Sequence, residues 1–92
     1  MQSAFEIVAE PARRAILDEL RSGPLPVGDL SRLTGLSQPN TSRHLRIMRD
    51  AGVVSSRAAG QRRVYELRPE GLAELAGWLT PYVLMLQRSH SR

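Results

Sequence analysis

Apolar residues recur every three or four positions through the first half of the chain, a period that predicts amphipathic helices. We expect a first helix over about residues 3–9, with Phe5, Val8 and Ala9 buried. A second helix is expected over residues 11–21, where Pro11 suits the first helical position. Its apolar side comprises Ala12, Ala15, Ile16 and Leu20. Its charged residues are expected to face solvent: Arg13, Arg14, Asp18, Glu19 and Arg21.

A short helix is expected next, over about residues 27–34. Val27, Leu30 and Leu33 mark its predicted inner face, and Asp29 lies in its first turn, where the helix dipole favours a negative charge. The small side chain of Ser31 is expected where this helix approaches the following one.

Gly35 suits the left-handed conformation that ends a helix, and Ser37 is a good N-cap for the next one. That helix is expected over about residues 38–51. Its predicted apolar stripe comprises Thr41, Leu45 and Met48. Two short helices joined by a tight turn with a glycine are typical of a helix-turn-helix.

The period then changes from helical to alternating, which predicts two short strands, Val53–Arg57 and Arg62–Leu67. Residues 58–61 join them. In the second strand, one face should carry Arg63, Tyr65 and Leu67, and the other Arg62, Val64 and Glu66.

The last segment begins at Pro69 and carries a long apolar stripe at helical spacing. The stripe comprises Leu72, Leu75, Leu79, Val83 and Leu86. Pro81 either kinks one helix or, with Thr80 as a cap, begins a new one. Further apolar residues widen this surface: Trp78, Tyr82, Leu84 and Met85. A helix that is apolar on more than one face needs a second surface to cover it, and we expect another copy of the chain.

The length, the absence of cysteine and the short apolar runs exclude several classes of protein. The chain has 92 residues, as expected for one domain (residues 1–92), and no cysteine, which excludes disulfides, thiolate metal sites and thiol nucleophiles. The longest apolar run, residues 82–86, is far shorter than the roughly 18 residues needed to span a membrane. No signal peptide is visible at the N-terminus. We therefore expect a cytoplasmic protein with no membrane partner.

Positive charge is concentrated in one stretch. All 13 basic residues are arginine, against nine acids. Residues 37–63 contain six arginines and one acid, a net charge of +5, whereas the other 65 residues have a net charge of −1. A charged stretch of this kind over a helix-turn-helix and a hairpin indicates a surface for a polyanion.

Several segments together resemble the ArsR/SmtB-type winged-helix repressors over about residues 5–80. They are Ile16-Leu17, Asp29-Leu30, Gly35 to Pro39, Ser42 to Leu45, Ala51 to Val54 and Gly60 to Leu67. The resemblance implies a mainly α fold with a small β-hairpin, a winged helix-turn-helix of order α-α-α-α-β-β-α. It also implies a homodimeric bacterial transcription regulator that binds double-stranded DNA. The second helix of the motif would enter the major groove, and the hairpin wing would lie over the backbone.

Three sets of site residues follow. Base-reading residues are expected on the recognition helix: Gln38, Asn40, Ser42, Arg43 and Arg46. Ser37 and Thr41 suit phosphate contacts, and His44 either contacts DNA or packs at the core edge. The wing would contact phosphates or a minor groove through Arg57, Gln61, Arg62 and Arg63. The dimer interface would comprise Phe5, Val8, Leu72, Leu75, Trp78, Leu79, Tyr82, Val83 and Leu86.

The metal sites common in this family are not expected here. Pro26 and Gly28 occupy the positions where such members carry cysteines, and the last helix lacks paired ligands around Glu70, Glu74 and His90. We expect no metal, no cofactor and no enzymatic activity. The effector would be a small molecule, a partner protein, or absent. The alternative function is a winged-helix module that contacts an acidic protein or RNA.

Overall fold

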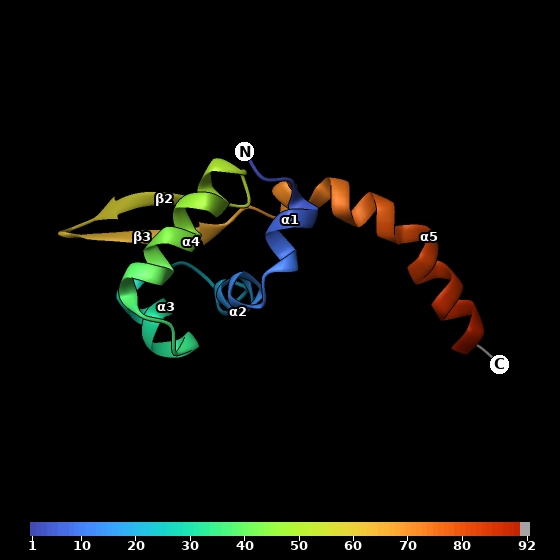
Figure 1. Ribbon diagram of the computed structural model, residues 1–92, viewed down its shortest axis with the longest axis horizontal. Coiled ribbons are helices and arrows are strands. Elements are labelled where there is room, and N and C mark those ends of the chain that lie inside the picture. Colours follow the sequence, from blue (N-terminus) through green and yellow to red (C-terminus); the bar gives the residue numbers. More distant parts are fainter. Residues whose placement is uncertain (91–92) are drawn as a thin grey trace.

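The computed structural model describes residues 1–90 and is mainly helical, with a small sheet (Figure 1). The helices are α1 (Ala4–Ala9), α2 (Pro11–Leu20), α3 (Val27–Thr34), α4 (Gln38–Asp50) and α5 (Ala73–His90), with a 3-10 segment η1 (Pro69–Leu72). The strands are β1 (Leu25–Pro26), β2 (Val54–Ala59) and β3 (Arg62–Leu67). The predicted winged helix-turn-helix and the order of its helices are confirmed.

The sheet has three antiparallel strands in the order β1-β3-β2, so the prediction of a two-stranded hairpin was incomplete. Leu25 pairs with Tyr65 and Pro26 with Val64. The added strand has only two residues, one of them a proline that lacks an N–H, and such an edge strand leaves little trace in a hydrophobic pattern. β2 extends two residues beyond the predicted range, and Gly60 (φ +65°) allows the tight turn at the tip.

The core is built from α1 to α4 and the base of the hairpin. Its buried apolar residues are Ile7, Ile16, Leu17, Leu20, Leu30, Leu45, Met48, Val53 and Val54. In α1 the buried residues are Ala4 and Ile7, whereas Phe5 and Ala9 are exposed, so the predicted burial of those two was wrong. The rotation of α1 that buries Ile7 leaves Phe5 on the side facing α5.

Leu33 is 47% exposed, which corrects its prediction as an inward residue. The inner side of α3 is completed instead by two hydroxyl side chains. The Ser31 hydroxyl donates to the Leu36 carbonyl (2.6 Å), and that of Thr34 donates to the Leu30 carbonyl (2.6 Å). These bonds hold Ser31 and Thr34 toward the turn between α3 and α4, so Leu33 lies on the opposite side of the helix.

Arg13 is buried, with 5% of its surface exposed, although the sequence pattern placed it on the solvent side of α2. Its guanidinium donates to the carbonyls of Ile7 (Nε, 3.1 Å) and Glu6 (Nη2, 3.2 Å). The neighbouring Arg14 donates to the Val8 carbonyl (2.7 Å). Two successive arginines of α2 therefore donate to carbonyls in the last turn of α1, where backbone donors are short in supply; the Ile7 carbonyl has in addition only a long bond from the Glu10 N–H (3.5 Å).

A close backbone crossing joins the start of the C-terminal segment to the end of α4. A Cβ added to Gly71 would collide with the Gly52 carbonyl oxygen and would lie 2.8 Å from the Val53 Cα. Only glycine fits this crossing, and it sets the point at which the chain leaves the winged helix-turn-helix.

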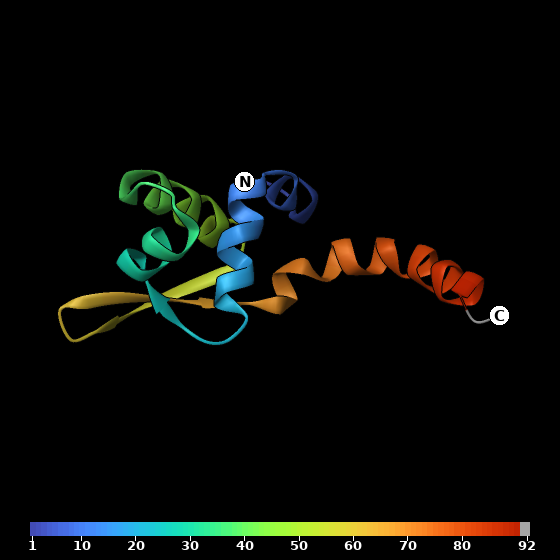
Figure 2. The same cartoon turned by 90° about the horizontal axis from the view of Figure 1, so that it is seen from below.

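Pro81 lies inside α5, which settles the open question in favour of one helix. The Thr80 hydroxyl donates to the Ala76 carbonyl (2.7 Å), and both features bend a helix (Figure 1). α5 extends away from the remaining elements (Figure 2), so the molecule measures 53 × 26 × 21 Å. Its radius of gyration is 14.9 Å, against about 12 Å for a compact domain of this length. Within residues 1–90, no helix combines the length and hydropathy required to cross a membrane.

Candidate nucleic-acid interface

α4 begins with its first turn open to solvent. Gly35 adopts a left-handed conformation (φ +76°) that ends α3, and Ser37 then caps α4 by accepting a hydrogen bond from the Asn40 N–H (3.2 Å). Ser37, Gln38 and Asn40 are all exposed. The N-terminal end of a helix carries unpaired N–H groups and partial positive charge, which suits it to an anion.

The exposed side of α4 carries most of the predicted base-reading residues. Gln38, Asn40, Arg43 and Arg46 are exposed, and Ser42 is half-buried. These side chains offer amide and guanidinium groups in the pattern that can read base edges. The opposite side of α4 is buried through Leu45 and Met48, so the core fixes which side faces outward.

Thr41 does not belong to this exposed side. Its side chain is 0% exposed, and its hydroxyl donates to the Ser37 carbonyl (2.8 Å). The prediction of a phosphate contact through the Thr41 hydroxyl is therefore wrong, because Thr41 is buried on the apolar side of α4 and its hydroxyl is bonded to the Ser37 carbonyl.

His44 is only 6% exposed, and its Nδ1 atom has no hydrogen-bond partner within the described residues. Burial lowers the pKa of His44, and the positive charges of Arg43 and Arg13 lower it further, which outweighs the opposite effect of Glu10. The imidazole is thus kept neutral and away from solvent. This arrangement favours the packing role over the predicted DNA contact.

The wing carries its predicted side chains in exposed positions: Arg57, Gln61, Arg62 and Arg63. The strand register places Arg57 opposite Val64 and Ala58 opposite Arg63. Because side chains alternate between the two faces of a strand, Arg57 and Arg62 share one face and Arg63 lies on the other. Arg63 donates to the Ser56 hydroxyl across the hairpin (3.0 Å).

An acid on α3 contacts the wing, a contact that the sequence pattern did not reveal. Asp29 Oδ1 lies 3.6 Å from Nη2 of Arg62 and 3.6 Å from Nη2 of Arg32. The three-residue spacing of Asp29 and Arg32 could have suggested their pair. The pair with Arg62 depends on the fold, which brings α3 next to the beginning of β3.

The basic elements and α5 lie at opposite ends of the molecule. In Figures 1 and 2, α3, α4 and the β2–β3 wing occupy one end, and α5 projects from the other. The surface suited to a polyanion is therefore separate from the large apolar surface of α5.

Residues 10–56 match the model of a protein family described as "Bacterial regulatory protein, arsR family". This chain belongs to the arsR family. It is 47% identical over 72 residues to the HTH-type transcriptional regulator Rv2034 of Mycobacterium tuberculosis (78% of this chain, 67% of that protein). It is 32% identical over 83 residues to the transcriptional repressor SdpR of Bacillus subtilis (90% of this chain, 92% of that protein).

Solved structures of ArsR-type regulators share this fold. The crystal structure of a possible transcriptional regulator for arsenical resistance matches all of this chain and all of its own (TM-score 0.80, 31% identity). The homodimeric winged helix-turn-helix DNA-binding domain Mb0332 of Mycobacterium bovis, solved by NMR, matches 97% of this chain and 82% of its own (TM-score 0.74, 25% identity). This ArsR-family chain is therefore a winged helix-turn-helix transcriptional regulator.

The predicted dimer residues of this ArsR-family regulator gather on α5, η1 and α1. None of the residues of α5 is buried in the single chain. Phe5 packs edge-on against Trp78 (ring centroids 6.0 Å apart), and the rings of Trp78 and Tyr82 lie beside each other at a tilt of 39° (centroids 5.0 Å apart), although Trp78 is 57% exposed. The other exposed apolar residues of α5 are Leu79, Val83, Leu84, Met85 and Leu86, while Val8, Leu72 and Leu75 are half-buried.

Proposed function

We propose that this chain is a homodimeric transcriptional repressor that binds an inverted-repeat DNA operator. The observation that carries the proposal is the polar exposed side of α4, bordered by an arginine-bearing wing. Residues 37–63 contain this surface and have a net charge of +5. In a helix-turn-helix, the recognition helix enters the major groove with its N-terminal residues toward the bases.

Each exposed side chain has a role suited to its chemistry. Gln38 and Asn40 can bond the N6 and N7 atoms of adenine, and Arg43 and Arg46 can bond the O6 and N7 atoms of guanine. The Ser37 end of α4 and the wing arginines contact phosphates, which position the protein without reading sequence. The alternative of a protein-docking surface is not favoured, because such a surface carries aromatic or aliphatic residues at its centre.

The homodimer is proposed from the exposed apolar surface of α5. The chain has 6184 Å² of accessible surface, whereas a compact monomer of 10.2 kDa exposes about 5300 Å². The excess is close to the roughly 800 Å² that each partner buries in a standard interface. A second copy covers it most simply through its own α1, η1 and α5. The solved domain from Mycobacterium bovis, which is described as homodimeric, supports self-association.

A selection experiment tests sequence-specific binding. Random-sequence duplexes retained by the purified protein should converge on an inverted repeat with half-site centres about 34–36 Å apart. Arg43→Ala should weaken binding to the selected site by about 1–3 kcal/mol and relax preference at one base pair. Arg88→Ala removes the same charge from α5 and should leave binding nearly unchanged. If no sequence is enriched, or if Arg43→Ala weakens selected and random duplexes equally, the proposed reading role is wrong.

The oligomeric state is tested separately. Leu79 is exposed and lies outside the buried core, so Leu79→Asp should give a folded monomer. Sedimentation equilibrium gives the mass and circular dichroism gives the helix content. A variant that remains a dimer would place the interface elsewhere.

A further inference from the structure

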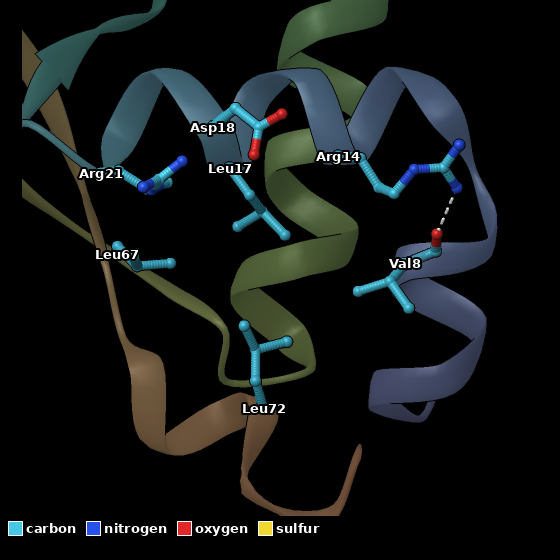
Figure 3. Close-up of a pocket in the computed structure, with 7 residues that line it drawn as sticks. All are labelled: Val8, Arg14, Leu17, Asp18, Arg21, Leu67 and Leu72. Atoms are coloured by element: carbon cyan, nitrogen blue, oxygen red, sulfur yellow. Dashed lines mark hydrogen bonds between the residues drawn. The ribbon is translucent and has the colours of Figure 1, made fainter. Parts of the chain in front are cut away.

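A pocket of about 310 Å³ opens between α1, α2, the end of β3 and η1. It is lined by Val8, Arg14, Leu17, Asp18, Arg21, Leu67 and Leu72. Figure 3 shows the four apolar side chains around a common space, with the three charged residues along the α2 side. The volume is at the lower end of the range for small-molecule pockets, about 300–1,000 Å³.

The charged side of the pocket follows one face of α2. Arg14, Asp18 and Arg21 are spaced four and three residues apart, so they lie side by side along the helix. The guanidinium of Arg14 is positioned by its bond to the Val8 carbonyl (2.7 Å), which uses one of its five donors. Within residues 1–90, the ion pairs join Asp29 to Arg32 and to Arg62, so Asp18 and Arg21 keep their charges available.

We propose that this pocket binds a free α-amino acid with an apolar side chain. The side chain would contact Val8, Leu17, Leu67 and Leu72. The ammonium group would pair with the Asp18 carboxylate, and the carboxylate group with the neighbouring guanidinium of Arg21, while Arg14 remains bonded to the Val8 carbonyl. Charge-assisted bonds of this kind are the strong ones, and arginine matches a carboxylate with two parallel donors.

Simpler ligands fit the charge pattern less well. A purely apolar molecule makes no use of the Asp18 and Arg21 charges. A fatty acid places its carboxylate beside the like charge of Asp18, and an alkylamine places its ammonium beside two arginines. A zwitterion with an apolar group satisfies both signs and the apolar walls together.

The pocket is distinct from the DNA surface, because none of its lining residues lies on α4 or near the tip of the wing. Val8 and Leu72 also belong to the proposed dimer surface, so the pocket adjoins that surface. Binding of the amino acid is measured without DNA, and the outcome is thereby independent of the proposed repressor function.

The test is a titration of the full chain by isothermal calorimetry, with heteronuclear NMR shifts to locate the ligand. L-leucine and L-phenylalanine should bind with dissociation constants below about 1 mM. Three matched probes each lack one feature: N-acetyl-L-leucine lacks the positive charge, L-leucinamide the carboxylate, and glycine the apolar side chain. Each should bind at least about tenfold more weakly, because each leaves a charged or apolar partner unmatched.

Two variants assign the charged contacts. In Asp18→Asn, leucine should lose its advantage over N-acetyl-L-leucine, and in Arg21→Gln it should lose its advantage over leucinamide. Asp50→Asn and Arg88→Gln make the same changes away from the pocket and should bind leucine like the unmodified protein. All four positions are exposed, and circular dichroism confirms that each variant is folded.

Three results would overturn the proposal. The first is no binding of leucine or phenylalanine up to about 10 mM. The second is equal binding of leucine and its N-acetyl form. The third is unchanged leucine binding in both pocket variants.

Discussion

Replacement of Arg13 by methionine tests whether a buried arginine holds α1 in place. Arg13→Met keeps a long, flexible side chain in the space but removes the donors to the Ile7 and Glu6 carbonyls. A hydrogen bond to a charged group contributes about 1.5–3 kcal/mol, and loss of the guanidinium leaves the Ile7 carbonyl with only the long bond from the Glu10 N–H (3.5 Å). Removal of the buried charge itself offsets part of this loss. We therefore expect the free energy of unfolding to fall by about 2–4 kcal/mol.

That loss is large for this protein. A chain of 92 residues is stable by only about 5–14 kcal/mol, and each kcal/mol shifts the melting temperature by about 4–8 °C at this size. The melting temperature of Arg13→Met should therefore fall by roughly 8–32 °C. The assay is thermal unfolding followed by circular dichroism, at one fixed protomer concentration because self-association shifts the transition.

Arg14→Met provides the matched control. Arg14 caps the same helix through the Val8 carbonyl, but its side chain is exposed, and water can replace the lost donor. Its melting temperature should change by less than about 5 °C. Equal shifts for the two variants would refute the reasoning, because they would show that burial of the guanidinium adds nothing to the cap.

Three further changes probe the fold and the DNA surface. Gly71→Ala should destabilise the protein by at least about 1–3 kcal/mol in chemical denaturation, because its Cβ would meet backbone that has no room to move. The pKa of His44 is lowered in the native state, so the unfolded chain binds more protons below pH 6.5, and the free energy of unfolding should fall as pH decreases from that value. Asp29→Asn removes the partner of Arg62 and should strengthen binding to any duplex by about two- to fivefold in a gel-shift titration.

Each of these changes has a matched control. Gly77→Ala adds a methyl group in open space inside α5 and should stabilise the chain slightly. His44→Gln should flatten the dependence on pH, whereas His90→Gln should preserve it. Glu70→Gln removes an exposed acid outside the basic surface and should leave DNA affinity unchanged. The reasoning fails if a control behaves like its test variant, or if Asp29→Asn weakens binding.

The helical period and the turn signals were sufficient to predict the winged helix-turn-helix, because each element carries its own local signal. Leu45 and Met48 are large apolar residues that are stable only when buried. Gly35 ends α3, and Ser37 caps the start of α4. The exposed side of α4 follows directly from that burial, which is why Arg43 was predicted on the correct side.

The predictions that failed share one cause: they depended on contacts between elements, which no local sequence pattern reveals. Arg13 was expected in solvent because it is charged, yet the end of α1 offers carbonyls that need a donor. Thr41 was assigned to a phosphate contact by residue type, whereas the fold buries it; His44 is buried as well, which agrees with the core-edge alternative left open for it. β1 is recognisable only through its partner β3, and the pair of Asp29 with Arg62 joins residues 33 positions apart in the chain.

The place of Trp78 gives the protein an intrinsic optical reporter. The chain has one tryptophan, and its ring lies on the proposed dimer surface, in contact with Phe5 of α1 and Tyr82 of α5 and outside α4 and the wing. All of the indole fluorescence therefore originates at the proposed site of self-association. Its emission shifts to shorter wavelength when a second copy excludes water from the ring, so dimer formation can be followed on unlabelled protein without interference from the DNA-binding end.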